Sequence, residues 1–174
     1  MDAKDVLRSI QRMAMAIVEQ THGPQQLALV GVRRGGVPIA TWMAEFIRKS
    51  EGLEVPVGTV DISLYRDDAA SALPDPKIGP SHVPFDIKGK DVVLVDDVLH
   101  TGRTIRAAIE CLLDYGRPRR IWLAVLCDRG ARELPIMADF VGREVKVPEG
   151  VLLDACVDSE KIEDAFVRLR NRVG

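Results

Sequence analysis

The feature that most constrains this chain is an apolar strand that ends in two adjacent acids, in the sequence VVLVDDVLHTGRT (residues 92–104). Four consecutive apolar residues predict a strand that is buried on both faces, as strands of a parallel sheet are. Asp96 and Asp97 follow at its carboxyl end, and a short turn with hydroxyl groups at Thr101 and Thr104 comes next. The segment therefore predicts a strand, a polar turn and then a new element.

That new element is a helix over residues 105–115, which ends at Gly116 and Pro118. In a turn from a strand to a helix, backbone N–H groups and the positive end of the helix point at one spot, which suits a phosphate. Gly102 gives the turn its flexibility. Acids on one side and an anion site on the other indicate a ligand with hydroxyls and a phosphate, such as a ribose 5-phosphate.

Other interpretations of the segment require motifs that the chain lacks. A P-loop NTPase also has an apolar strand that ends in acids, but the sequence has no G-x-x-x-x-G-K-[ST]. A Rossmann dinucleotide site needs G-x-G-x-x-G, which is also absent. A core strand with two solvated acids is the remaining alternative, and it requires the acids, the glycine and both threonines to coincide by chance.

The segment resembles the phosphoribosyl pyrophosphate (PRPP) motif of the type I phosphoribosyltransferases. Three more stretches resemble one branch, the PyrR family: VGVRRGG (residues 30–36), DISLYRDD (61–68) and LCDRGARELP (126–135). Members of that family are pyrimidine operon regulators and uracil phosphoribosyltransferases. The resemblance implies transfer of ribose 5-phosphate from PRPP to uracil, which gives UMP and pyrophosphate with Mg²⁺ as cofactor. It also implies UMP-dependent binding of pyrimidine operon leader RNA, which regulates transcription by attenuation.

The order of the predicted elements indicates an α/β fold with a mostly parallel sheet flanked by helices. Ligands of such sheets lie beyond the carboxyl ends of the strands. Besides the strand and helix of the PRPP motif, the predicted strands cover residues 27–32, 55–65 and 121–127, and the predicted helices cover residues 3–20, 38–49 and 160–172.

Length and composition, with 47% hydrophobic and 29% charged residues, fit one domain over residues 1–174, and the resemblance implies that it is a phosphoribosyltransferase domain. We expect a core over about residues 3–134, a small C-terminal hood that covers the base over about residues 135–158, and a flexible lid over about residues 66–84.

Location and partners are bounded by the same composition. The chain has no stretch as apolar as a membrane span and no signal-peptide character at its start, so we expect a cytoplasmic protein without a membrane partner. Cys111, Cys127 and Cys156 are expected to be buried free thiols. A net charge of −2 gives no overall attraction to nucleic acid, so an RNA site must be a local patch.

By resemblance, Asp96 and Asp97 are catalytic residues that contact the ribose hydroxyls. One of them also helps to fix Mg²⁺ through water, and no direct metal ligand is expected. Arg66 is the third catalytic residue, because it begins the lid and would close over pyrophosphate; a plain turn at residues 67–68 is the alternative.

The remaining PRPP contacts form two groups. The 5-phosphate cradle comprises Val98, Leu99, His100, Thr101, Gly102, Arg103 and Thr104. We interpret His100 as a loop residue rather than a base, and Arg103 as either a phosphate contact or a solvated side chain. The pyrophosphate loop comprises Arg33, Arg34, Gly35 and Gly36, and either arginine is a candidate for the pyrophosphate contact.

The base and RNA contacts rest on weaker segments. The predicted base pocket comprises Asp128, Arg129, Arg132, Val151 and Leu152. An alternative for Arg132 is a surface pair with Glu133. The predicted RNA contacts are Lys4, Arg8 and Arg12, which recur every four residues of a helix; a solvated helix face explains the same spacing.

Two other functions remain open, a purine phosphoribosyltransferase and a non-catalytic RNA-binding nucleotide sensor. We expect the protein to assemble as a homodimer or a homotetramer.

Overall fold

The computed structural model describes residues 1–63, 81–158 and 160–171. Its main element is a five-stranded parallel sheet with the strand order β2-β1-β3-β4-β5. The strands are β1 (Leu27–Val32), β2 (Val57–Val60), β3 (Asp91–Leu99), β4 (Arg120–Asp128) and β5 (Phe140–Glu144). All six residues of β1 and the apolar residues 92–95 of β3 are buried, as the apolar runs predict, and Asp91 and Asp96 at either end of the β3 run are buried as well.

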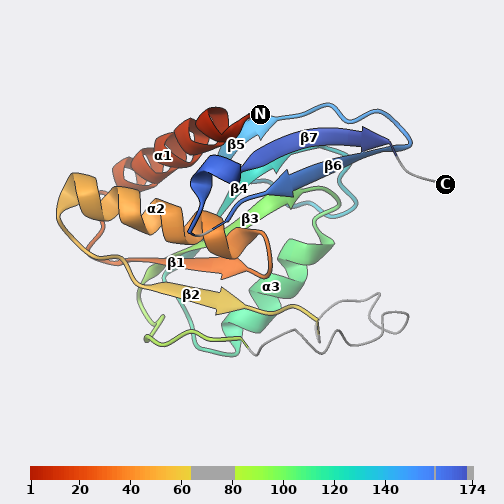
Figure 1. Cartoon of the computed structure of the whole chain (residues 1–174). Coiled ribbons are helices and arrows are strands. Elements are labelled where there is room, and N and C mark those ends of the chain that lie inside the picture. Colours follow the sequence, from red (N-terminus) through yellow and green to blue (C-terminus); the bar gives the residue numbers. More distant parts are fainter. Residues whose placement is uncertain (64–80, 159, 172–174) are drawn as a thin grey trace.

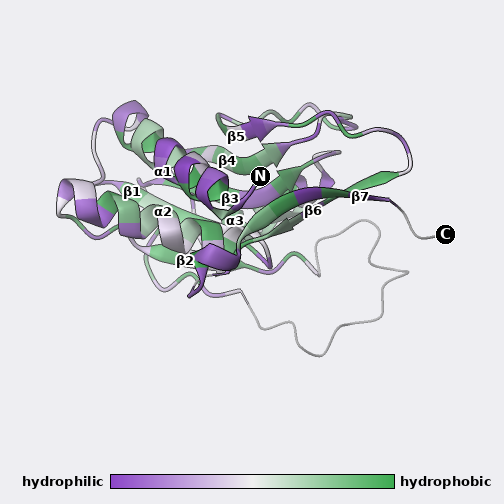
Figure 2. Cartoon of the chain, turned by 45° about the horizontal axis from the view of Figure 1, so that its top comes forward, coloured by the Kyte–Doolittle hydropathy of each residue, from purple (hydrophilic) through white to green (hydrophobic). Residues whose placement is uncertain are grey.

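Helices cover both faces of this sheet (Figure 1). The helices α1 (Ala3–Gln20) and α2 (Gly36–Glu51) contribute to one hydrophobic core, and α3 (Arg103–Leu113) contributes to a second core on the other face. Figure 2 shows why α1 is a surface helix, since hydrophilic and hydrophobic residues alternate around it. The predicted α/β class with helices on both faces is therefore confirmed.

The C-terminal part forms an antiparallel hairpin of β6 (Val151–Cys156) and β7 (Phe166–Asn171), with a short 3-10 helix at Ile162–Asp164. The helix predicted over residues 160–172 is therefore wrong. Strand pairing decides the outcome, because Leu153 pairs with Leu169 and Asp154 with Arg168 across the hairpin. The Val167 N–H also donates to the Met1 carbonyl at 3.0 Å, which ties the hairpin to the start of α1.

Three smaller expectations need correction. Residues 140–144, which the sequence assigned to the hood, form the fifth strand of the main sheet, so the hood is the β6–β7 hairpin. The strand predicted over residues 55–65 is shorter and covers only β2. Cys111 and Cys127 are buried free thiols, as expected, but Cys156 is exposed.

The strand order places a switch point between β1 and β3. From β1 the chain crosses to β2 on one side, whereas β3 is followed by β4 and β5 on the other side. In open α/β sheets, ligands bind at the carboxyl ends of the strands where the order reverses. The turns after β1 and after β3 lie at that place, so the topology positions them as the two sides of one site.

Substitution of Gly31 by Ala tests the close packing of α2 on β1. A Cβ at Gly31 would lie 2.5 Å from Val37 Cα, a backbone atom that has no room to move away. We expect a loss of about 1–3 kcal/mol in the free energy of unfolding, measured by urea denaturation. The control Thr41→Ala, at an exposed position of α2, should change it by less than about 0.5 kcal/mol. Equal stability of G31A and the wild-type protein would contradict this packing.

Candidate active site

Two helices begin at the switch point, and neither has a side-chain cap. The residue before α2 is Gly35 and the residue before α3 is Gly102, and no acid lies in the first turn of either helix. By contrast, α1 begins at Asp2, whose side chain accepts a hydrogen bond from the Asp5 N–H. Because the first N–H groups of a helix have no partner within it, α2 and α3 present two sites for anions.

The acids of β3 lie directly against the turn after β1 (residues 33–35, the β1–α2 turn). A Cβ on Gly35 would lie 2.1 Å from Asp97 Oδ2, and one on Gly36 would lie 1.9 Å from the Val95 carbonyl oxygen. Only glycine permits this approach of backbone to carboxylate. The two groups that the sequence assigned separately to ribose and to pyrophosphate are therefore neighbours in space.

Burial shapes the electrostatics of the acid pair. Asp96 is only 5% exposed, and burial and then repulsion by Asp97 raise the pKa of its carboxyl well above its usual value. Burial also raises the pKa of Asp97, against the hydrogen bonds that it receives from Asp96 and from the Val98 N–H. Without a ligand, the pair therefore holds a proton more readily than ordinary aspartates do, and a bound cation would displace it.

The β1–α2 turn has a cis peptide bond between Arg33 and Arg34. Arg33 Nε is buried and has no hydrogen-bond partner among the residues that the structure describes, whereas the Arg34 side chain is exposed. A buried guanidinium donor without a partner is unfavourable, and an anion in the turn would satisfy it. This favours Arg33 over Arg34 as the arginine that contacts an anion there.

The turn after β3 (residues 100–102, the β3–α3 turn) is held by the loop that follows β4 (residues 129–139, the β4–β5 loop). The Thr101 carbonyl accepts from the Glu133 N–H at 3.0 Å and from the Leu134 N–H at 3.1 Å. Arg103 Nε donates to Glu133 Oε2 at 2.7 Å, so the exposed Arg103 side chain has a partner in the β4–β5 loop. Sequence reasoning missed Glu133, because only the fold brings it to this turn.

The predicted base residues Asp128, Arg129 and Arg132 lie at the end of β4 and in the β4–β5 loop, and their contacts differ. Arg129 Nε is buried and lacks a hydrogen-bond partner among the described residues. Arg132 pairs with Asp128, not with Glu133, so the surface pair considered for it is wrong. Partial burial and then the charge of Arg129 lower the pKa of His100, whose carbonyl accepts from Arg132 Nη1 at 2.8 Å. His100 therefore favours its neutral form.

The hood begins beyond the carboxyl end of the sheet. The Val145 N–H donates to the Asp128 carbonyl at 2.8 Å, and the chain enters β6 six residues later at Val151. Val151 and Leu152 are half-buried there, and the hairpin extends past the end of β1 in Figure 1.

The predicted catalytic residue Arg66 lies outside the described residues. Most of the predicted lid also lies outside them.

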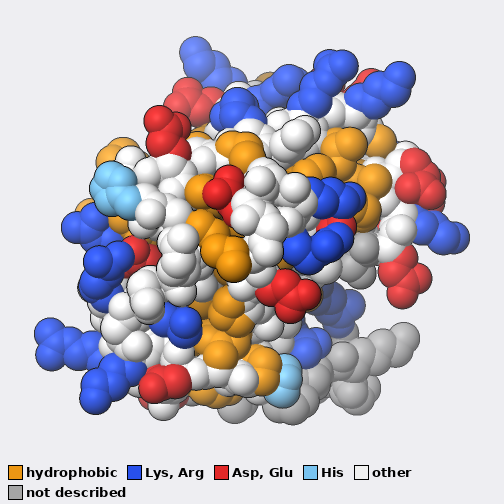
Figure 3. All heavy atoms as spheres, turned by 90° about the vertical axis from the view of Figure 1, so that its left-hand side faces the viewer, with side chains coloured by type: hydrophobic (Ala, Val, Ile, Leu, Met, Phe, Trp, Pro, Cys, Tyr) orange, Lys and Arg blue, Asp and Glu red, His pale blue; other side chains and the backbone are white. Residues whose placement is uncertain are grey.

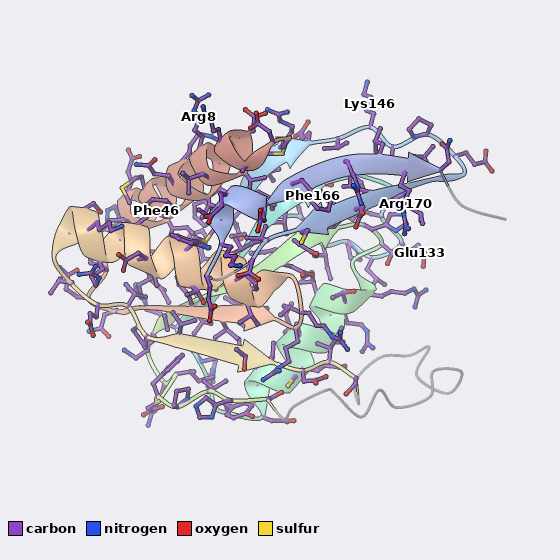
Figure 4. The ribbon with its side chains drawn as sticks, viewed as in Figure 1. Arg8, Phe46, Glu133, Lys146, Phe166 and Arg170 are labelled. Atoms are coloured by element: carbon purple, nitrogen blue, oxygen red, sulfur yellow. The ribbon has the colours of Figure 1, made fainter. Side chains whose placement is uncertain are left out.

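The predicted RNA residues share a face of α1 but differ in their contacts. Lys4 and Arg8 are exposed. The Arg12 guanidinium donates to the carbonyls of Val141 at 3.3 Å and Gly142 at 2.5 Å, so it also ties α1 to β5. In Figure 4, Arg8 and Lys146 project outward from the same side of the molecule.

The opposite end of the sheet has a different character. Figure 3 looks onto the amino ends of the strands, where Lys and Arg side chains are interspersed with Asp and Glu. The buried Asp91 at the start of β3 pairs there with Arg119.

The described residues include no helix with the length and apolarity needed to cross a membrane.

The donor set fits a magnesium ion that arrives with its substrate. Carboxylate oxygens are hard ligands, and Mg²⁺ in phosphate-binding sites takes one or two carboxylates together with substrate oxygens. Asp97 Oδ2 lies against the β1–α2 turn, which is where an anion would meet it. The residues present therefore fit Mg²⁺, which Asp97 would hold together with oxygens of a bound anion.

Comparisons with known proteins identify the family of the chain. The family described as "Phosphoribosyl transferase domain" matches residues 2–153. One curated relative is "Bifunctional protein PyrR" of Thermus thermophilus, which is 50% identical over 100% of this chain and 96% of the relative. Another is "Bifunctional protein PyrR" of Roseiflexus sp., which is 55% identical over 83% of this chain and 79% of the relative. The chain belongs to the PyrR family of type I phosphoribosyltransferases.

Solved structures similar to this PyrR-family chain share its fold. A hypoxanthine-guanine phosphoribosyltransferase of Bacillus anthracis is 18% identical with a TM-score of 0.66 and coverage of 84% of this chain and 82% of its own. A hypoxanthine phosphoribosyltransferase of Staphylococcus aureus is 20% identical with a TM-score of 0.62, and the match covers 86% of this chain and 78% of that one. At these identities the likeness supports the fold alone.

Substitution of Asp96 by Asn tests the cost of the buried acid. The raised pKa means that the folded protein binds more protons than the unfolded chain, so stability falls as pH rises from the ordinary aspartate range through the folded pKa. We expect D96N to be more stable than the wild-type protein in thermal unfolding at pH 7, and the gain to shrink as pH falls towards about 4.

A matched control is Asp91→Asn, which removes a buried acid that forms an ion pair with Arg119. Because that pair is favourable, D91N should lower stability, by on the order of 1 kcal/mol since Arg119 is exposed. Destabilisation of D96N at pH 7 would contradict the argument from burial.

Proposed function

We propose that this protein transfers the ribose 5-phosphate group of PRPP to uracil, which gives UMP and pyrophosphate. The curated relatives carry the name "Bifunctional protein PyrR", and the resemblance of the PRPP, lid and β4–β5 segments supports the same reaction. In it, a nitrogen of the base forms the bond to C1 of the ribose, the bond from C1 to pyrophosphate breaks, and the nitrogen loses its proton.

The observation that carries the proposal is the pair of helices that begin after glycines, with the buried Asp96 and the partly buried Asp97 between them. PRPP has an anion at each end, a 5-phosphate and a pyrophosphate, with ribose hydroxyls in the middle. The start of α3 suits the 5-phosphate, and the start of α2 suits the pyrophosphate. Asp96 and Asp97 lie between these helix ends, where they accept hydrogen bonds from the hydroxyls.

The charges of the site match those of the reaction. Positive charge develops on the ribose ring, and the carboxylates of β3 lie where they stabilise it. Negative charge develops on the leaving group, which the α2 N-terminus and Arg33 would bind. Mg²⁺, when bound, neutralises the pyrophosphate oxygens. Arg66, which lies outside the described residues, is proposed to close over the leaving group and exclude water.

Uracil would bind between the end of β4 and the hood. Its ring needs an apolar slot, which Val151 and Leu152 would supply, and hydrogen bonds to its two carbonyls and N3–H. The unpartnered Arg129 Nε is a candidate donor, and Asp128 is a candidate acceptor at the rim. We further propose a cytoplasmic location and a homodimer or homotetramer.

The test is incubation of the protein with PRPP, Mg²⁺ and each nucleobase in turn, with nucleotide products separated by chromatography. We expect UMP from uracil, and D97N, which removes a carboxylate from the centre of the site, should reduce turnover by roughly 100-fold or more. Product from hypoxanthine or guanine but none from uracil would establish a purine enzyme instead and contradict the proposal.

We also propose that UMP-dependent binding of pyrimidine operon leader RNA occurs on the outer face of α1. The second activity in the name of the relatives motivates this, and Lys4, Arg8 and Arg12 are its predicted contacts. Arg143, which follows the Arg12-bound carbonyls, is exposed beside them. Phosphate contacts of this kind release counterions, so binding should weaken as salt increases.

Filter binding with labelled leader RNA, with and without UMP and across a salt series, tests this surface. We expect K4E/R8E to weaken UMP-stimulated binding by roughly tenfold or more and to lower the salt slope by about 2. A control with the same charge change is K88E/R117E, at two exposed positions near the amino ends of the strands. Equal affinities of the two double variants would show that α1 is not the RNA face.

A further inference from the structure

Arg132 makes an unusual number of contacts for a side chain at the rim of a pocket. Its Nε donates to the Ile136 carbonyl at 2.9 Å, and its Nη1 donates to the carbonyls of His100 at 2.8 Å and Gly130 at 3.2 Å. Its Nη2 forms an ion pair with Asp128. Four of the five N–H donors of the guanidinium are thus in use, and at most one is left for a ligand.

These contacts join two parts of the site. The His100 carbonyl belongs to the β3–α3 turn, and the other acceptors belong to β4 and the β4–β5 loop. The backbone of the loop continues the same attachment, because the Arg129 N–H donates to the Leu99 carbonyl and the Glu133 N–H to the Thr101 carbonyl, both at 3.0 Å. Three consecutive carbonyls, at the last residue of β3 and the first two residues of the turn, are therefore held from one side.

Holding a carbonyl fixes the direction of the next N–H. The peptide unit is planar and trans, so the C=O of one residue and the N–H of the following residue point in opposite directions. With the carbonyls of Leu99, His100 and Thr101 bound to the β4–β5 loop, the N–H groups of His100, Thr101 and Gly102 are directed away from it. Of these three attachments, the one at His100 comes from a side chain, that of Arg132.

The packing around Gly102 leaves the turn little room to move. A Cβ there would lie 3.3 Å from Ile136 Cβ and 3.4 Å from Leu134 Cβ, and the φ of Gly102 is +92°. The β4–β5 loop therefore lies against the turn through side chains as well as through hydrogen bonds. Figure 4 shows Glu133, the neighbour of Arg132, near the start of α3.

We propose that Arg132 is a positioning residue for the 5-phosphate and not a contact of the base. By gripping the His100 carbonyl, it orients the Thr101 N–H and sets the phosphate cradle of the β3–α3 turn. This role rests on the proposed function for the identity of the ligand, a sugar 5-phosphate. It also predicts that a substitution of Arg132 weakens the affinity for ligands with a 5-phosphate. The affinity for pyrophosphate should not change, because pyrophosphate would bind at the β1–α2 turn.

Calorimetric titration of Arg132→Lys with ribose 5-phosphate and, separately, with Mg²⁺ and pyrophosphate tests the proposal. Lysine keeps the charge but lacks the planar donors that span four acceptors. We expect the affinity for ribose 5-phosphate to fall by roughly tenfold or more and that for pyrophosphate to change by less than about twofold. In turnover, the KM for PRPP should rise while the KM for uracil stays within about twofold.

Pyrophosphate binding serves as the internal control for folding, because a variant that is partly unfolded would bind both ligands less tightly. Arg119→Lys is the matched variant, since Arg119 also pairs with a buried aspartate but at the opposite end of the sheet, and it should change neither affinity. Equal losses for both ligands, unchanged affinity for ribose 5-phosphate, or a raised KM for uracil alone would overturn the role of Arg132. A wild-type protein that binds no ribose 5-phosphate would overturn the proposed function as well.

Discussion

The contact between the glycines of the β1–α2 turn and the end of β3 determines where every other part of the site lies. Gly36 approaches the Val95 carbonyl and Gly35 approaches the Asp97 carboxylate so closely that a methyl group at either position would overlap its neighbour. This contact brings the start of α2 beside the acids of β3, while the start of α3 follows from β3 itself. One anion site therefore lies on each side of the two carboxylates, as a sugar with phosphates at both ends requires.

The site is built at a cost to stability that the rest of the fold offsets. The buried Asp96 lies next to the partly buried Asp97, and two helices start without side-chain caps. Each of these features is unfavourable in the empty protein and favourable once an anionic, hydroxyl-bearing ligand is bound. The hydrophobic cores on both faces of the sheet supply the compensating burial, and they leave the carboxyl edge free for binding.

The sequence predicted the central elements well, because buried parallel strands appear as unbroken apolar runs such as those of β1 and β3. It failed at residues 160–172, where Ile162, Phe166 and Leu169 have a helical spacing but the need of β6 for a partner made residues 166–171 a strand. The short strand β5 was missed for a similar reason, since its place beside β4 depends on contacts far along the chain.

The site itself was predictable only as far as its motifs reach. Asp96, Asp97 and the glycine turns have recognisable local patterns, and the structure brings them together. The network around Arg132 has no such pattern, because it joins a side chain to carbonyls of two separate segments, the β3–α3 turn and the β4–β5 loop. The pairing of Arg103 with Glu133 likewise depends on how two loops meet. Interactions between loops follow from tertiary structure, and neither spacing nor composition encodes them in a readable form.

The most direct test of the account is a crystal structure of the protein with PRPP and Mg²⁺. We expect the 5-phosphate within hydrogen-bond distance of the N–H groups at the start of α3, the pyrophosphate at the start of α2, and the ribose hydroxyls on Asp96 and Asp97. A ligand in the reverse orientation, or one bound away from the carboxyl ends of β1 and β3, would contradict it.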